Sequence, residues 1–210
     1  MGTVPHTRDR RPGHRINNGW MEWHPRCAPS EEGCDNAMPR IGRQIVPGCV
    51  QHVINRGNRR ECIFRYPHDY REFLRLLRDA GQRFNVSLFV YCAMPNHFHL
   101  ILRPNERRAL SAYMHWLTST HVRRLHRRNG TVGEGHIYQE RYRTVAVASD
   151  IQFLNVCRYV EANPVRAGLV DRADEWPYSS ASGDDCGLRP RLDPWPIPKP
   201  ECWADLVGCP

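Results

Sequence analysis

Two apolar segments separated by only two residues constrain the fold of this chain most strongly. Residues 87–94 and 97–103 are rich in apolar and aromatic side chains, and Pro95 and Asn96 lie between them. Proline and asparagine favour tight turns, and segments of this length and composition are typical of β-strands. We therefore predict two antiparallel strands joined by a turn at Pro95 and Asn96.

Amphipathic segments flank this hairpin on both sides, with apolar side chains at helical spacing over residues 68–84 and 109–128. The predicted elements, in chain order, are a strand over 50–55, a helix over 68–84, the two hairpin strands, a helix over 109–128, a strand over about 142–147, and a last helix that is capped by Ser149 and ended near Asn163 by Pro164. This β-α-β-β-α-β order followed by a helix is that of a ferredoxin-like sheet. The predicted fold class is α+β, an antiparallel sheet with helices on one face and an added C-terminal helix.

Segments of different composition bound this patterned region. Residues 1–37 show no apolar periodicity, which predicts a disordered leader. Met38 opens the patterned region and is the expected natural start; a genuine flexible arm over residues 1–37 is the alternative. Residues 38–180 form the expected domain, and the Pro-rich residues 181–210 are expected to be an irregular tail.

The net charge of +8 is concentrated in the expected domain. Residues 38–180 contain 22 Arg and 12 Asp or Glu, whereas the flanking segments add no positive excess. A basic folded domain favours a nucleic-acid partner, with a plainly solvated surface as the alternative. No apolar run reaches the about 18 residues that a membrane helix needs, and no signal-peptide core precedes the domain. We therefore expect a cytoplasmic protein with no membrane partner.

The nine cysteines form no C-x-x-C pair. Cys49, Cys62, Cys92 and Cys157 lie in predicted core elements, where a free cysteine behaves as a small hydrophobic residue. An odd count without a secretion signal indicates reduced thiols. The spacing therefore argues against a structural zinc site.

His97 and His99 begin the second strand of the hairpin. Side chains two residues apart on a strand point to the same face, so the two imidazoles would project together while Phe98 and Leu100 face the core. Two neighbouring neutral imidazoles are a candidate ligand pair for a divalent metal ion, which could polarise a phosphate oxygen. The alternative is a pair of histidines that are merely packed or solvated on the sheet.

A polar stripe runs along the last predicted helix, where Gln152, Asn155, Tyr159 and Asn163 recur at helical spacing. The stripe could be no more than the solvated face of this helix. Alternatively, Tyr159 supplies a nucleophilic oxygen and Asn163, one turn later, supplies a carbonyl oxygen to the metal. Tyrosine is a weak nucleophile near neutral pH, so this second interpretation requires help from a metal or a base.

Arginines gather after the first predicted strand and on the second predicted helix. Gly57, inside the first cluster, would let backbone N–H groups approach a phosphate closely. The second cluster could instead be a solvated helix end that suits the helix dipole. The candidate DNA-binding residues are Arg56, Arg59, Arg60, Arg123, Arg124, Arg127 and Arg128.

Several of these segments occur together in a known family. They are INRGNRR at residues 54–60, YCAMPNHFHLIL at 91–102, GEGHIYQERY at 133–142, RYVEANPVRAGLV at 158–170 and WPYSS at 176–180. In this order they resemble the single-tyrosine (HUH) transposases of the IS200-like superfamily, above all the branch associated with repetitive extragenic palindromes (REP). The resemblance covers about residues 38–180.

The resemblance implies a ferredoxin-like transposase that acts on single-stranded DNA beside a hairpin, in the bacterial cytoplasm at the nucleoid. Tyr159 would be the catalytic nucleophile, and His97, His99 and Asn163 would bind Mg²⁺ or Mn²⁺. Attack by Tyr159 would give a 5′-phosphotyrosine link and a free 3′-OH, and another 3′-OH could reverse the step and transfer the strand. The protein would be a monomer or a homodimer. Two other functions stay open: a domesticated DNA- or RNA-binding module without turnover, and a metal-dependent nuclease that activates water.

Overall fold

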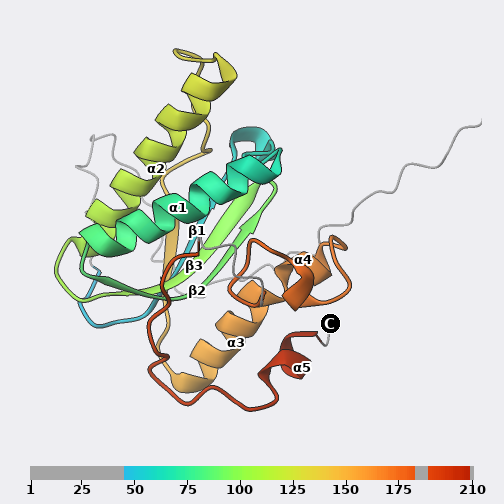
Figure 1. The fold of residues 1–210 in the computed structure, drawn as a ribbon. Helices are drawn as coiled ribbons and strands as arrows, with labels where there is room; N and C mark the ends of the chain where they lie inside the picture. Colours follow the sequence, from blue (N-terminus) through green and yellow to red (C-terminus); the bar gives the residue numbers. More distant parts are fainter. Residues whose placement is uncertain (1–44, 183–188, 209–210) are drawn as a thin grey trace, which may run out of the picture. The chain divides into compact units, whose positions relative to one another are not determined.

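The computed structural model describes residues 45–182 and 189–208 (Figure 1). The leader predicted over residues 1–37 lies outside the described residues. Within the described ranges, strands and helices follow one another in the predicted order.

Four strands form one antiparallel sheet. They are β1 (Gln51–Arg56), β2 (Val86–Met94), β3 (His97–Pro104) and β4 (Arg143–Ala146), and their spatial order is β2-β3-β1-β4. β3 pairs with β2 across the two-residue turn and with β1 on its other side, and β4 pairs with the other edge of β1. This order and the antiparallel pairing confirm the ferredoxin-like sheet.

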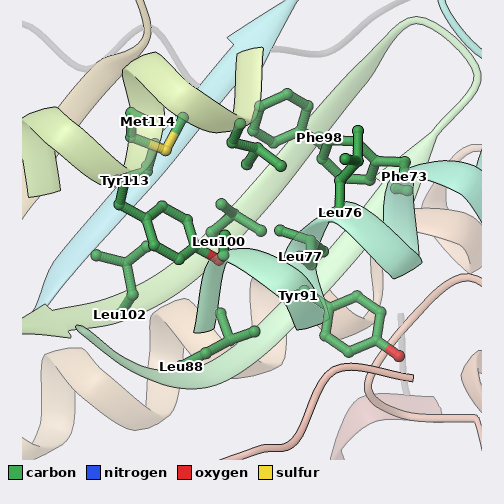
Figure 2. Close-up of a cluster of buried hydrophobic side chains, with 14 of the residues drawn as sticks. Phe73, Leu76, Leu77, Leu88, Tyr91, Phe98, Leu100, Leu102, Tyr113 and Met114 are labelled. Atoms are coloured by element: carbon green, nitrogen blue, oxygen red, sulfur yellow. The ribbon is translucent and has the colours of Figure 1, made fainter. Parts of the chain in front are cut away.

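Two long helices, α1 (Pro67–Arg83) and α2 (Ala109–Asn129), pack together on one face of the sheet (Figure 1). The core beneath them includes Phe73, Leu77, Tyr113 and Met114 from the helices and Phe98, Leu100 and Leu102 from β3 (Figure 2). Full burial of one large apolar side chain contributes about 1.5–3 kcal/mol, so this core holds Phe98 and Leu100 inward. The residues that alternate with them on β3 must face the other side. No helix in the described ranges is long and apolar enough to cross a bilayer.

A third helix, α3 (Asp150–Glu161), covers the opposite face of the sheet. Ser149 caps this helix as predicted, because its hydroxyl accepts a hydrogen bond of 3.3 Å from the backbone N–H of Gln152. The apolar side of α3 packs against β2 and β3 through Phe153, Leu154, Cys157 and Val160. These contacts fix where α3 crosses the sheet.

The chain stays helical beyond the predicted end of this helix. α3 ends at Glu161, and a short helix, α4 (Asn163–Arg166), follows with Pro164 in its first turn. The predicted end of the helix near Asn163 is therefore confirmed to within two residues, whereas the short helix α4 was not predicted. A proline in the first turn of a helix is tolerated because its missing N–H would have no partner there.

The described part of the tail is not wholly irregular, contrary to the prediction. A short 3₁₀ helix, η2 (Ala173–Glu175), precedes the tail. The last described residues of the tail form a helix, α5 (Trp203–Gly208). Trp203 is buried in the core under α3, and its indole N–H donates a hydrogen bond of 2.7 Å to the carboxylate of Glu161. The hydroxyl of Ser180 donates to the same carboxylate at 2.6 Å. The tail thus holds the C-terminal end of α3.

We expect Trp203→Ala to lower the free energy of unfolding by about 3–5 kcal/mol, because it removes a buried aromatic side chain and leaves a cavity. Urea unfolding followed by far-UV circular dichroism measures the change. Leu206→Ala, in the same helix at 37% exposure, is the matched control and should cost far less. Equal stabilities for the Trp203 variant and the wild type would show that the tail does not support the domain.

The cysteines differ in part from expectation. Cys92 and Cys157 are buried as predicted, whereas Cys49 and Cys62 are exposed. Cys49 precedes β1 and Cys62 follows the first strand's loop, so neither lies under a covering helix. In the described ranges Cys49, Cys62, Cys92, Cys157 and Cys202 are free cysteines.

Candidate active site

The histidine pair lies on the face of the sheet that α3 covers. In the register of β1 and β3, Arg56 pairs with His97 and Ile54 pairs with His99. Directly paired residues of an antiparallel sheet share a face. His52, two residues before Ile54 on β1, therefore lies on this face as well. The period-two prediction for His97 and His99 is confirmed.

Each histidine of the pair has one ring nitrogen held by a neighbour. The Nδ1 atom of His97 lies 2.7 Å from Oδ1 of Asn96, and the Nδ1 atom of His99 lies 2.9 Å from Nε2 of His52. An amide oxygen only accepts hydrogen bonds, so Nδ1 of His97 carries the proton and its Nε2 keeps a lone pair. Nε2 of His99 is buried and has no hydrogen-bond partner in the described part of the chain.

Burial keeps these imidazoles neutral. It lowers the pKa of His52 to about 4, and burial together with the charge of Arg56 lowers the pKa of His97 to about 4. Burial, with smaller contributions from its histidine neighbours and Arg56, holds the pKa of His99 well below its usual value. Neutral imidazole is the form that binds metals. Two neutral rings 4.9 Å apart, one with an unpartnered buried nitrogen, fit a divalent metal ion.

The helix bearing Tyr159 reaches this pair within a single chain. The Tyr159 ring lies 5.7 Å from the His99 ring and 6.3 Å from the His52 ring, edge-on to both. Tyr159 is half-buried, so its hydroxyl group is not sealed inside the core. The structure therefore brings together the tyrosine and the histidine pair.

Asn163 is one turn beyond Tyr159, as predicted. Its amide nitrogen donates a hydrogen bond of 2.8 Å to the backbone carbonyl of Tyr159, which leaves its amide oxygen as the atom that could bind a metal. In residues 45–182 and 189–208, no group of three His, Cys, Asp or Glu side chains is placed to hold a metal ion. A third protein ligand beside His97 and His99 would therefore have to be of another type, such as this amide. That role of Asn163 stays a prediction.

Two arginines lie beside Tyr159. The guanidinium carbon of Arg166 is 5.6 Å from the centre of the Tyr159 ring. Arg56 is close enough for its charge to interact with the Tyr159 hydroxyl, while burial and the charge of Arg60 lower the pKa of Arg56. Arg56 was predicted as a DNA-binding residue after the first strand, and Arg166 was not predicted as a site residue. The spacing of seven residues between Tyr159 and Arg166, two helical turns, is the signal that could have indicated it.

The loop after β1 carries Arg59 and Arg60, the other two arginines of the predicted cluster that includes Arg56. Arg59 and Arg60 lie in the 3₁₀ helix η1 (Asn58–Arg60) and are both exposed. The side-chain amide of Asn96 donates to the backbone carbonyl of Arg60 at 3.2 Å, so this loop sits beside the turn that precedes His97. Arg59 and Arg60 therefore lie beside the turn that leads into His97, and their contact with DNA stays a prediction.

Gly57 has a different role from the predicted one. Its N–H donates to the carbonyl of Asn96 at 2.8 Å and is not available to a phosphate. A Cβ atom at this position would lie 2.3 Å from the carbonyl oxygen of Glu61, a distance that no side chain tolerates. Glycine is needed here for the close approach of two backbone segments.

The arginines on α2 lie on the other face of the sheet from Tyr159. Arg128 forms ion pairs with Glu72, at 2.7 Å, and with Asp69 of α1, and Arg124 lies 3.5 Å from Glu72. Acidic residues of α1 therefore pair with Arg124 and Arg128, and the DNA-binding role of these two arginines stays a prediction. The remaining pair, Arg123 and Arg127, is exposed, and Arg123 donates to Thr120.

An antiparallel ferredoxin-like sheet with a tyrosine-bearing helix over a histidine pair is the arrangement expected of a single-tyrosine transposase. Residues 45–163, more than half of the chain, match the family described as "Transposase IS200 like". The chain belongs to this family of DNA-processing enzymes.

Two known proteins are similar to this chain. A protein of Haemophilus influenzae described as a REP-associated tyrosine transposase is 25% identical over 128 residues, which are 57% of this chain and 73% of the relative. The solved structure of a REP-associated tyrosine transposase bound to a REP hairpin superimposes with a TM-score of 0.56 at 19% identity, over 68% of this chain and 82% of that one. At 19% identity, the similarity to this solved structure shows a shared fold.

Proposed function

We propose that this protein cleaves and rejoins single-stranded DNA, with Tyr159 as the nucleophile and a divalent metal ion at His97 and His99. One observation carries the proposal. Tyr159 faces His99 at 5.7 Å between ring centres, and Nε2 of His99 is buried without a hydrogen-bond partner in the described residues. An unsatisfied buried polar group costs about 1–3 kcal/mol, which a metal at Nε2 would offset. Nε2 of His121 is also buried without a partner in the described residues, but His121 packs among Phe64, Phe73 and Tyr138 in the core. What favours a metal at His99 is therefore the combination of its unpartnered nitrogen with His97 and Tyr159 beside it.

In this proposal, Nε2 of His97, Nε2 of His99 and the amide oxygen of Asn163 hold Mg²⁺ or Mn²⁺. The ion, when bound, polarises the phosphate that is attacked. The hydroxyl oxygen of Tyr159 attacks the phosphorus atom as its proton leaves to solvent. The bond from phosphorus to the 3′ oxygen breaks, and that oxygen takes up a proton.

The products are a 5′-phosphotyrosine link and a free 3′-OH. One phosphoester replaces another, so a second 3′-OH can reverse the step and join a new strand without an external energy source. Arg56 and Arg166 lie beside Tyr159 and stabilise negative charge on its oxygen as the proton leaves.

The proposed substrate is single-stranded DNA next to a hairpin. A similar fold occurs in a transposase that is bound to a REP hairpin. The basic excess of residues 38–180 and the exposed Arg59 and Arg60 beside the site suit a phosphate backbone. Tyr159 is half-buried on the face of the sheet that α3 covers, and this position suits a single strand.

We expect the double variant Arg59→Ala/Arg60→Ala to bind hairpin DNA more weakly and with a flatter salt dependence. Each phosphate contact to a single strand contributes about 0.7 to the slope of log K against log salt, so losing two contacts should lower the slope by about 1.4. Fluorescence anisotropy at several salt concentrations measures both quantities.

The matched control is Arg75→Ala/Arg107→Ala, which removes the same charge from two exposed positions away from η1. If the control lost as much affinity and slope as the Arg59/Arg60 variant, the effect would be one of net charge, and the proposed contact at η1 would be wrong.

A further inference from the structure

A third histidine, His52, lies behind the histidine pair and has no role in the reaction described so far. It is 8% exposed and faces the same side of the sheet as His97 and His99. Its Nε2 atom is 2.9 Å from Nδ1 of His99, and the two rings stack with centres 5.2 Å apart. The edge of Tyr159 packs against it. His52 therefore contacts both a proposed metal ligand and the proposed nucleophile.

A hydrogen bond between two neutral imidazoles needs one donor and one acceptor, so two arrangements are possible. If His52 donates, Nδ1 of His99 accepts, and the proton of His99 sits on its buried Nε2, which then has no acceptor in the described residues. If His99 donates, its buried Nε2 carries a lone pair that has no partner in the described residues. Only the second arrangement can bind a metal through Nε2.

His97 shows the same pattern with another partner. Its Nδ1 donates to the amide oxygen of Asn96 at 2.7 Å, which frees its Nε2. An acceptor behind Nδ1 is the usual way in which a protein orients a metal-binding histidine and makes it more basic. For His99, the only such acceptor that the described residues supply at Nδ1 is His52.

We propose that His52 is a positioning residue, which accepts a hydrogen bond from Nδ1–H of His99 and so holds Nε2 of His99 toward the metal. In this arrangement Nε2 of the neutral His52 accepts the hydrogen bond and its Nδ1 carries the proton, so neither nitrogen of His52 is free to bind the metal. This inference rests on the metal site of the proposed function.

The test is Mn²⁺ binding to the full-length protein without DNA, measured by the electron paramagnetic resonance signal of free Mn²⁺. His52→Phe keeps a ring but removes the acceptor, and we expect its affinity for Mn²⁺ to fall about 10–100-fold. His52→Gln keeps an acceptor and should recover part of this loss. His126→Phe is the matched control, because His126 is a half-buried histidine whose Nδ1 bonds to Thr131, outside the site.

The outcomes separate the two proposals. If the wild type binds Mn²⁺ and His99→Asn abolishes binding, but His52→Phe binds as well as the wild type, the role of His52 is overturned and the metal site stands. If the wild type binds no Mn²⁺, or His99→Asn binds equally well, the metal site of the proposed function fails, and the role of His52 with it.

A measurement on the wild type avoids the risk that a His52 variant does not fold. Long-range ¹H–¹⁵N spectra of the metal-free protein report which nitrogen of His99 carries the proton. We expect a proton on Nδ1. A proton on Nε2 would overturn the inference directly.

Discussion

Tyr159→Phe is expected to abolish both DNA cleavage and the covalent protein–DNA adduct. Phenylalanine keeps the ring that packs edge-on against His99 and His52, so the site should stay assembled. Only the attacking oxygen is lost. Removal of a nucleophile costs about four orders of magnitude or more in rate, which is below detection in a gel assay.

The measurement is a denaturing gel of the protein incubated with Mn²⁺ and end-labelled single-stranded hairpin DNA. Tyr66→Phe is the matched control, because Tyr66 is 61% exposed and should be dispensable for the chemistry. Cleavage that persists in the Tyr159 variant would refute the assignment. Cleavage by the wild type without an adduct would favour a nuclease that activates water, and binding without cleavage would favour a silent DNA-binding module.

The order of the elements and the position of the histidine pair could be predicted because both depend on local periodicity. Phe98 and Leu100 mark the inner face of β3, and His97 and His99 then have to share the outer face. Side chains alternate between the two faces of any strand because of the strand's own geometry, so this alternation does not depend on how the rest of the chain packs.

The missed residues depend on contacts between distant segments. The position of His52 near the site depends on the pairing register of β1 and β3, which places it opposite Ile101 and next to His99. Nothing in the sequence around His52 indicates which residue of β3 it will meet. The ion pairs of Arg124 and Arg128 could not be predicted for the same reason, because Glu72 and Asp69 on α1 meet these arginines only once the two helices pack.

The short helix α4, which follows the end of α3, could not be predicted from local rules. The preference of residues before proline for extended backbone predicts a stop at Pro164. The structure keeps Asn163 helical and starts α4 there, and this brings Arg166 over the Tyr159 ring. Pro164 is buried in the first turn of α4, a position where proline is tolerated, so the local preference does not prevent this helix.

The double variant His97→Asn/His99→Asn should lose metal-dependent cleavage at every Mn²⁺ concentration. Asparagine places its amide near the position of Nδ1 and can keep the hydrogen bonds to Asn96 and His52, but it has no atom at the position of Nε2. The fold should therefore survive while both proposed imidazole ligands are gone. The metal contributes several kcal/mol to the stabilisation of the transition state, which corresponds to a loss of about three orders of magnitude in rate.

Cleavage rates measured against Mn²⁺ concentration test this expectation, with EDTA-treated wild type as the reference for metal-free protein. DNA affinity without metal should be unchanged, because Arg59 and Arg60 lie outside the substituted strand. A single His97→Asn variant keeps His99 and should regain part of its rate at high Mn²⁺. If the double variant cleaved at the wild-type rate in Mn²⁺, the histidine pair would be a packed structural feature of the sheet and the metal would have to bind elsewhere.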